Sequence, residues 1–212
     1  THHGAYDMAF LRPVPNLTIC APMNEVELRN MMFSAVSVNS EIAEESSSVN
    51  NSQSPFVIRY PRGCGAVADW HQPFQRLEIG KGRKLKDGDN VAILSLGNIG
   101  NNVAKAIAEY EAENPGKSVA HYDMRFLKPL DLNILREVAR EYKKIITVED
   151  GCKVGGFGSA VLENICEICN EESLTIPHIR ILGIPDKFID HGTVAQLQSI
   201  CGIDVEGIKN NI

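Results

Sequence analysis

The sequence lacks an apolar run long enough to cross a lipid bilayer. One of its longest apolar runs is VAILSL at residues 91–96, whereas a membrane-spanning helix needs about 20 consecutive apolar residues. A secretory signal peptide, with its charged start and apolar centre, is also missing. These absences predict a cytoplasmic protein that has no membrane as a partner.

Positive charge is scarce relative to negative charge. The chain has 21 Lys and Arg against 27 Asp and Glu, which gives a formal net charge of -6. A nucleic-acid surface needs clustered Lys and Arg, so this balance argues against nucleic acid as the main partner. Small phosphorylated substrates stay possible, because they need only one or two well-placed cations.

A disulfide framework is also missing. Six cysteines are scattered over 212 residues, which is typical of a protein in a reducing cytosol. Cys166 and Cys169 form a CxxC pair inside an amphipathic helical pattern, and no second pair completes a zinc site. We therefore expect buried thiols rather than a redox or metal centre, and no metal ligands in this chain.

The length and composition predict a folded globular chain. With 43% apolar and 23% charged residues, 212 residues suffice for one large domain, or for one complete domain plus part of another. The first residue is Thr1 rather than Met. We interpret this start as that of a processed, proteolysed or truncated chain.

The first part of the chain predicts a short α/β segment. An apolar strand is expected at 17–22 and a helix at 24–36, with Asn24 as its cap. The polar stretch 39–54 predicts an exposed, mobile loop. Residues 55–60 predict a second strand, which the Pro and Gly of the PRGCG segment end.

The second part of the chain predicts a mostly parallel sheet covered by helices. After a linker that contains a short strand at 77–82, apolar strands alternate with amphipathic helices, which is typical of βα units. The fold class is therefore α/β. The expected strands are 90–97, 117–123, 144–150 and 177–184, and the expected helices are 101–113, 131–142, 158–170 and 193–200.

A Gly-rich turn at 151–160 precedes one of these helices. It lacks the GxGxxG spacing with a downstream acidic residue, and it lacks the lysine of a phosphate-binding P-loop. Its free backbone N–H groups could hold an anion. We prefer close backbone packing at a domain or dimer contact.

Several segments, taken in order, resemble one enzyme family. The chain as a whole resembles the 1-deoxy-D-xylulose-5-phosphate synthases, and more distantly the transketolases and the β subunits of 2-oxoacid dehydrogenases. Order and spacing over several segments carry the resemblance. The segments are HHGAYDMAFLRPVPNLTICAP at 2–22, FVIRYPRG at 56–63, MRFLKPLD at 124–131, TVEDG at 147–151, GGFGSAV at 155–161 and LGIPDKFIDHG at 182–192.

The resemblance implies a division of the chain. Residues 1–64 resemble the C-terminal part of the pyrimidine-binding domain, 65–85 form a linker, and 86–212 resemble the complete transketolase C-terminal-like domain. The polar loop around 37–54 is longer than the turn expected in the family. If that loop shifted the following strand, the assignment of the residues after the strand would change.

The resemblance also implies a reaction. The family condenses pyruvate with glyceraldehyde 3-phosphate and releases carbon dioxide, with thiamine diphosphate and Mg2+ as cofactors, for isoprenoid and thiamine biosynthesis. The enzymes act as homodimers. The diphosphate motif and the glutamate that activates the cofactor lie upstream of the matching segments. We therefore expect the isolated chain to bind no cofactor and to be inactive.

Two residues are the candidates for chemistry. His2 matches the family histidine in the pattern T-H-x-G, and its imidazole is suited to proton transfer near neutral pH. Its neighbour His3 stands where the family varies. Arg62 directly follows a strand, where α/β sheets present ligand-binding groups, and the family assigns it the aldehyde's phosphate. Arg59 is read as a possible partner in a structural ion pair.

Asp7, Arg12 and His191 have simpler interpretations. Asp7 and Arg12 flank the apolar turn 8–11, and we expect a salt bridge between them. We read His191 as part of loop structure. Two alternatives to the synthase stay open: a transketolase or 2-oxoacid dehydrogenase β subunit, and a non-catalytic assembly fragment.

Overall fold

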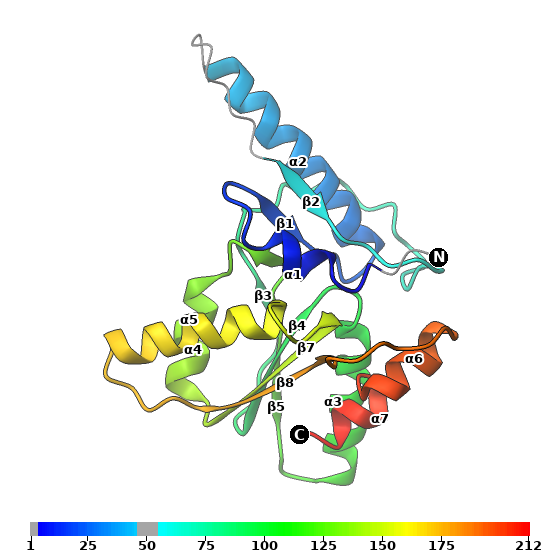
Figure 1. The fold of residues 1–212 in the computed structure, drawn as a ribbon, viewed down its shortest axis with the longest axis vertical. Helices are drawn as coiled ribbons and strands as arrows, with labels where there is room; N and C mark the ends of the chain where they lie inside the picture. Colours follow the sequence, from blue (N-terminus) through cyan, green and yellow to red (C-terminus); the bar gives the residue numbers. More distant parts are fainter. Residues whose placement is uncertain (1–3, 46–54) are drawn as a thin grey trace.

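The computed structural model describes residues 4–45 and 55–212 of the chain (Figure 1). Its strands form two sheets, one of five strands in the order β3-β5-β4-β7-β8 and one of three strands in the order β2-β1-β6. The small sheet and a long protruding helix lie at one end of the molecule, and the large sheet with its helices forms the rest. Within the described residues, no helix is long and apolar enough to cross a membrane.

The large sheet is mostly parallel, as predicted. Neighbours β5, β4, β7 and β8 run parallel, and only β3 joins antiparallel at the edge. Every residue of β4 is buried, because helices cover both faces of the sheet. The strands are β3 (Arg83–Lys86), β4 (Val91–Leu96), β5 (Val119–Asp123), β7 (Lys144–Cys152) and β8 (His178–Ile184).

Helices pack on the two faces of this sheet and create two apolar cores. Successive residues of β4 point to opposite faces, so Ile93 belongs to the core under α3 and α7, and Leu94 to the core under α4 and α5. All four helices predicted for this region are confirmed to within two residues at each end. The helices are α3 (Gly100–Glu113), α4 (Leu132–Glu141), α5 (Phe157–Glu171), α6 (Val194–Cys201) and α7 (Val205–Lys209).

Two of these helices begin at residues with a clear capping role. The Asp131 carboxylate accepts hydrogen bonds from the first N–H groups of α4. Thr193 and Gln196 form a capping box at the start of α6, and Gly202 ends that helix with a φ of 68°. These local signals explain why the sequence predicts the two helices well.

The small sheet joins distant parts of the chain. Strand β1 (Thr18–Cys20) pairs parallel with β2 (Phe56–Ile58) and antiparallel with β6 (Phe126–Lys128). The sequence analysis does not predict β6. Since β1 and β2 come from the predicted first region and β6 from the predicted third, the sheet combines the two regions. The division at 1–64, 65–85 and 86–212 stays a prediction.

Two helices belong to this end of the molecule, α1 (Asp7–Leu11) and α2 (Glu25–Glu45). The prediction of a loop from residue 39 is wrong for the part up to Glu45, where α2 continues. Helix-favouring Glu and Ala residues in this stretch account for the extension. The remainder of the predicted loop, 46–54, lies outside the described residues.

The linker packs along α2 instead of forming a strand. The predicted strand at 77–82 is wrong, because this stretch has no regular structure and β3 begins only at Arg83. Backbone N–H groups of the linker bind polar side chains of the helix: Gln75 N donates to Asn30 Oδ1 and Leu77 N to Ser34 Oγ. Buried polar partners on α2 thus replace a neighbouring strand.

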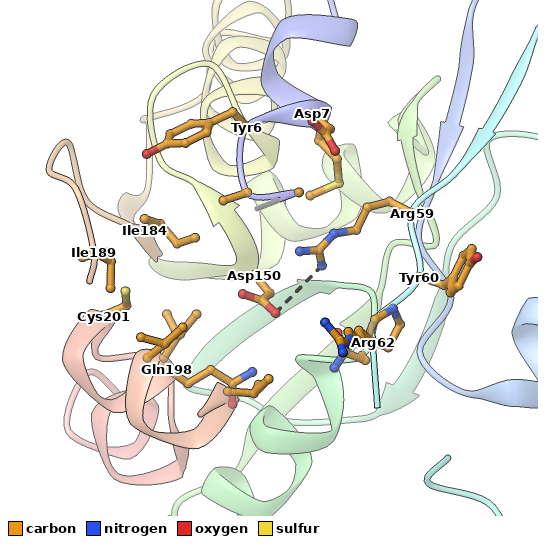
Figure 2. Close-up of a pocket in the computed structure, with 18 of the residues that line it drawn as sticks. Tyr6, Asp7, Arg59, Tyr60, Arg62, Asp150, Ile184, Ile189, Gln198 and Cys201 are labelled. Carbon is orange, nitrogen blue, oxygen red and sulfur yellow. Dashed lines mark ion pairs between the residues drawn. The ribbon is translucent and has the colours of Figure 1, made fainter. Parts of the chain in front are cut away.

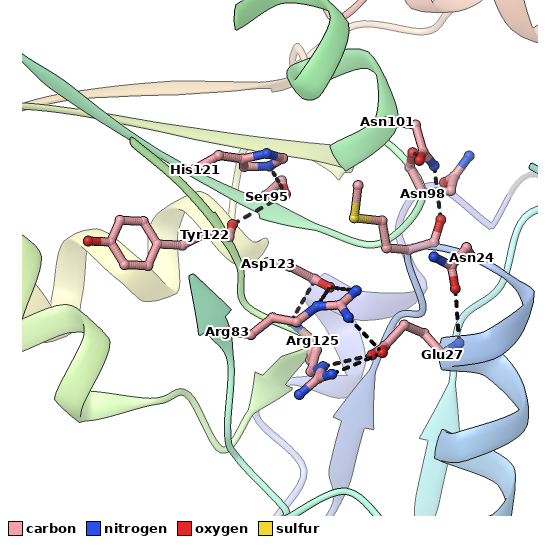
Figure 3. A network of polar contacts seen from close by, with 11 residues as sticks. Asn24, Glu27, Arg83, Ser95, Asn98, Asn101, His121, Tyr122, Asp123 and Arg125 are labelled. Carbon is pink, nitrogen blue, oxygen red and sulfur yellow. Dashed lines mark hydrogen bonds and ion pairs between the residues drawn. The ribbon is translucent and has the colours of Figure 1, made fainter. Parts of the chain in front are cut away.

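A charge network with two buried carboxylates also joins α2 to the large sheet (Figure 3). Arg125 donates two hydrogen bonds to the Glu27 carboxylate, at 2.7 and 2.9 Å, and Arg83 bridges Glu27 and Asp123 at 3.0 Å each. Glu27 is 3% exposed and Asp123 is fully buried. Burial raises the pKa of Asp123 to about 6. Each of the two buried carboxylates is therefore paired with at least one partly exposed arginine.

Candidate functional site

A cavity of about 870 Å³ lies between the small sheet and the large one (Figure 2). Its wall is formed by the start of α1, the chain after β2, the end of β7, the loop after β8 and helix α6. Much of the lining is apolar, including Met8, Val57, Ile184 and Leu197. The polar and charged side chains in the lining are Tyr6, Asp7, Arg59, Tyr60, Arg62, Asn98, Asp150, Gln198 and Cys201.

Arg62 lines this cavity, four residues after the end of β2. Arg59 N donates to Cys20 O at 2.9 Å, which is the last backbone contact that continues the strand pairing. The Arg62 side chain is exposed, and no carboxylate of the described residues pairs with it. Its guanidinium is therefore available to an anion from solution, at the carboxyl end of a strand.

Arg59 lines the same cavity and forms the ion pair that the sequence analysis considers for it. Its Nη1 lies 3.9 Å from Oδ2 of Asp150, and the two side chains are 19% and 23% exposed. Asp150 belongs to β7, so this pair connects the small sheet with the large one. Asp150 is not singled out by the sequence analysis. The signal was its place in TVEDG, near the end of a buried strand.

His2 lies outside the described residues. The described chain begins with residues that line the cavity, among them Ala5 and Asp7. Ala5 O accepts a hydrogen bond from Cys152 N at 3.0 Å, which attaches this segment to β7. The structure thus brings the segment after His2 and the strand end with Arg62 to one cavity.

The prediction that Arg12 forms a salt bridge with Asp7 is wrong, because Arg12 pairs with a different carboxylate. Arg12 donates two hydrogen bonds of 2.7 Å to Glu163 on α5 instead. This fork raises the pKa of Arg12, and it lowers the pKa of Glu163. Arg12 therefore attaches the end of α1 to helix α5, and its role is structural.

The Gly-rich turn is occupied by the protein's own carboxylate. Glu149 is 1% exposed and accepts hydrogen bonds of 2.9 Å from the N–H groups of Phe157 and Gly158, at the start of α5. Burial raises the pKa of Glu149 to about 7, while these two bonds favour its charged form. Since Glu149 takes the free N–H groups, the turn is a packing element rather than a cradle for a bound anion.

His191 does not line the cavity, although its neighbours Phe188 and Ile189 do. Its side chain is exposed on the loop after β8. This position agrees with the interpretation of His191 as part of loop structure.

The described residues do not present a metal-diphosphate site. No group of three or more His, Cys, Asp or Glu side chains gathers among residues 4–45 and 55–212 in a way that would hold a metal ion. The cations of the cavity, Arg59 and Arg62, suit an anionic group without a metal.

Residues 80–208, more than half of the chain, match the family model of the transketolase C-terminal domain. This chain belongs to that family. Its large sheet and the surrounding helices are the transketolase C-terminal-like fold, which confirms the predicted α/β class.

Curated relatives confirm the predicted resemblance. The chain is 49% identical over 212 residues to the 1-deoxy-D-xylulose-5-phosphate synthase of Bacteroides thetaiotaomicron, and 50% identical over 214 residues to that of Cytophaga hutchinsonii. Both matches cover 100% of this chain and 30% of the relative. The chain therefore spans less than a third of the length of these relatives.

Solved structures place the same fold in transketolases. A structure titled "Split gene transketolase, inactive beta4 tetramer" superposes with a TM-score of 0.76 at 28% identity, covering 99% of this chain and 60% of that one. A transketolase from Pichia stipitis gives a TM-score of 0.56 at 15% identity, over 99% of this chain and 26% of that one, and shares the fold alone.

Proposed function

We propose that this chain is the C-terminal portion of an enzyme that condenses pyruvate with glyceraldehyde 3-phosphate, releases carbon dioxide and forms 1-deoxy-D-xylulose 5-phosphate. The relatives at 49% and 50% identity carry the name of that synthase, which supports the reaction. The observation that carries the proposal is the exposed Arg62 guanidinium in a cavity, with no described carboxylate to neutralise it.

Arg62 binds the phosphate of the aldehyde in this proposal. A guanidinium presents two N–H groups in the geometry of two phosphate oxygens, and such a charge-assisted contact contributes about 1.5–3 kcal/mol. The contact orients the aldehyde carbon toward the rest of the site.

His2 shares or transfers a proton at the substrate's carbonyl or hydroxyl oxygen in this proposal. The support is the sequence pattern T-H-x-G together with the approach of the next described residues, from Gly4 onward, to the cavity. An imidazole changes charge near neutral pH and can act as acid or base there.

The intact enzyme also needs parts beyond this chain. Thiamine diphosphate with Mg2+ supplies the carbanion chemistry when it is bound, and residues outside this chain would hold it. We propose that the intact enzyme is a cytoplasmic homodimer that serves isoprenoid and thiamine biosynthesis. The isolated chain is inactive in this proposal.

Replacement of Arg62 in the full-length enzyme tests the phosphate assignment. In R62Q, the KM for glyceraldehyde 3-phosphate should rise about tenfold or more, because a charge-assisted contact is lost. The KM for pyruvate should stay the same, and R62K should show an intermediate value. Unchanged kinetics with the aldehyde phosphate in R62Q would contradict the assignment.

A transketolase is the second candidate, since the split-gene transketolase superposes closely on nearly the whole chain. A transketolase transfers a two-carbon unit from a ketose phosphate and does not use pyruvate. Incubation of the full-length enzyme with pyruvate and the aldehyde phosphate, and separately with xylulose 5-phosphate and ribose 5-phosphate, distinguishes the two candidates. Release of carbon dioxide in the first incubation alone supports the synthase.

A further inference from the structure

A second guanidinium lies in the cavity that contains Arg62. In a regular strand, residues three apart point to opposite faces. Here the chain leaves β2 after Ile58, and Pro61 interrupts it, so Arg59 and Arg62 both line the same cavity. Two arginines that line one cavity favour an anionic ligand over a neutral one.

The Arg59 guanidinium is attracted by a carboxylate but keeps its hydrogen-bond donors. The 3.9 Å between Arg59 Nη1 and Asp150 Oδ2 is too long for a hydrogen bond. Among the described residues, no acceptor binds the Arg59 side chain. Its N–H groups can therefore still donate to a ligand, as Figure 2 suggests by the direction of the side chain into the cavity.

Asp150 is held on a rigid element. It follows Glu149 near the end of β7, the strand between β4 and β8 in the large sheet. Neighbouring strand residues point to opposite sides, so Glu149 reaches α5 and Asp150 reaches the cavity. The position of Asp150 is thus set by the large sheet, not by the segment that contains the arginines.

We propose that Arg59 is a second phosphate-binding cation for the aldehyde substrate, and that Asp150 is the positioning residue that holds its guanidinium in the cavity. This inference rests on the proposed function. It gives the transketolase C-terminal-like region a direct part in substrate affinity, because Asp150 orders a long side chain that is otherwise free to adopt many rotamers.

The test uses the full-length enzyme with two aldehydes, glyceraldehyde 3-phosphate and glyceraldehyde, which lacks the phosphate. In R59Q, the KM for the phosphorylated aldehyde should rise about tenfold, with the KM for glyceraldehyde unchanged. R59K should lie between, since it keeps the charge and loses the fork. R136Q, at an arginine of α4 that pairs with Glu172, is the matched control and should behave as wild type.

Replacement of Asp150 tests the positioning role. D150N should raise the KM for glyceraldehyde 3-phosphate about threefold to fivefold, because a charge-assisted contact loses its alignment, and D150E should restore most of the affinity. A lower KM in D150N would contradict the positioning role of Asp150, because it would mean that the carboxylate only repels the phosphate. An equal loss with both aldehydes would overturn it too, as a purely structural effect.

Failure of the inference and failure of the proposed function can be told apart. If the wild-type enzyme turns over pyruvate and the aldehyde phosphate but R59Q keeps the wild-type KM, the inference falls and the function stands. If the wild type forms no product, the function falls. Calorimetric titration of full-length wild type and R59Q with inorganic phosphate then decides on the inference: weaker binding by R59Q supports it, and equal binding overturns it.

Discussion

Two sets of ion pairs connect the small-sheet end of the molecule with the large sheet, and they differ in the burial of their carboxylates and in the distances between the charged atoms. In the first set, the carboxylates of Glu27 and Asp123 are buried, and their contacts with Arg83 and Arg125 are 2.7–3.0 Å long. The pair of Arg59 and Asp150 is half-exposed, 3.9 Å long and lies in a cavity. Arg83 and Arg125 donate hydrogen bonds to protein carboxylates and so hold the structure together, whereas the Arg59 side chain makes no hydrogen bond to the described residues and can bind a ligand.

The largest expected effect comes from breaking the charge network of Glu27, Arg83, Asp123 and Arg125. E27Q removes the charge partner of Arg125 and one of the two buried carboxylates that Arg83 bridges, so the free energy of unfolding should fall by about 3–5 kcal/mol. Urea unfolding of the chain measures it. A loss below about 1 kcal/mol would mean that the charge network behaves like an exposed pair, and the comparison would fail.

A smaller effect is expected from pH, and it sharpens the distinction between buried and exposed carboxylates. Burial raises the pKa of Glu149 from its ordinary value of 4.5 to about 7. The folded state therefore binds the proton more tightly than the unfolded state. Stability should be highest below about pH 4.5 for this group, and it should fall by on the order of 1–3 kcal/mol as the pH rises to about 7.

The urea midpoint of wild type and E149Q, measured from pH 4.5 to pH 7.5, checks this prediction. E149Q should lose the part of the pH dependence that belongs to Glu149. An identical slope in E149Q and wild type would contradict the raised pKa.

The smallest expected effect is that of D150N on stability. A half-exposed pair at 3.9 Å should contribute less than about 1 kcal/mol, and less still at high salt. Urea unfolding at low and high ionic strength measures this. If D150N lowered the free energy of unfolding as much as E27Q does, the pair of Arg59 and Asp150 would be a structural ion pair. Its proposed role in ligand binding would then lose its physical basis.

The two regions also differ in how well their elements can be predicted. The large sheet and its main helices follow from apolar periodicity and capping residues such as Asp131 and Thr193. The small-sheet end is predicted less well. There, α2 continues to Glu45, β6 is not anticipated, and the linker packs on α2 through Asn30 and Ser34. Long-range polar contacts of this kind leave no periodic signal.

The candidate site shows the same limit. The position of Arg62 after a strand is readable from the sequence, because Pro and Gly end an apolar run there. The role of Arg62 and of His2 stays a prediction. The partner of Arg12 is predicted wrongly, because Glu163 stands 151 positions away. The sequence alone does not distinguish Glu163 from any other exposed carboxylate as a partner for Arg12.

By itself, the sequence determined the α/β class, the parallel sheet and the presence of an arginine at a strand end, because these depend on local periodicity and on turn residues. Only the tertiary structure decided that Arg59 meets Asp150, that Glu149 takes the N–H groups of α5, and that β6 joins β1. The reason is that ion pairs and strand pairings between distant segments are selected by the packing of the whole chain.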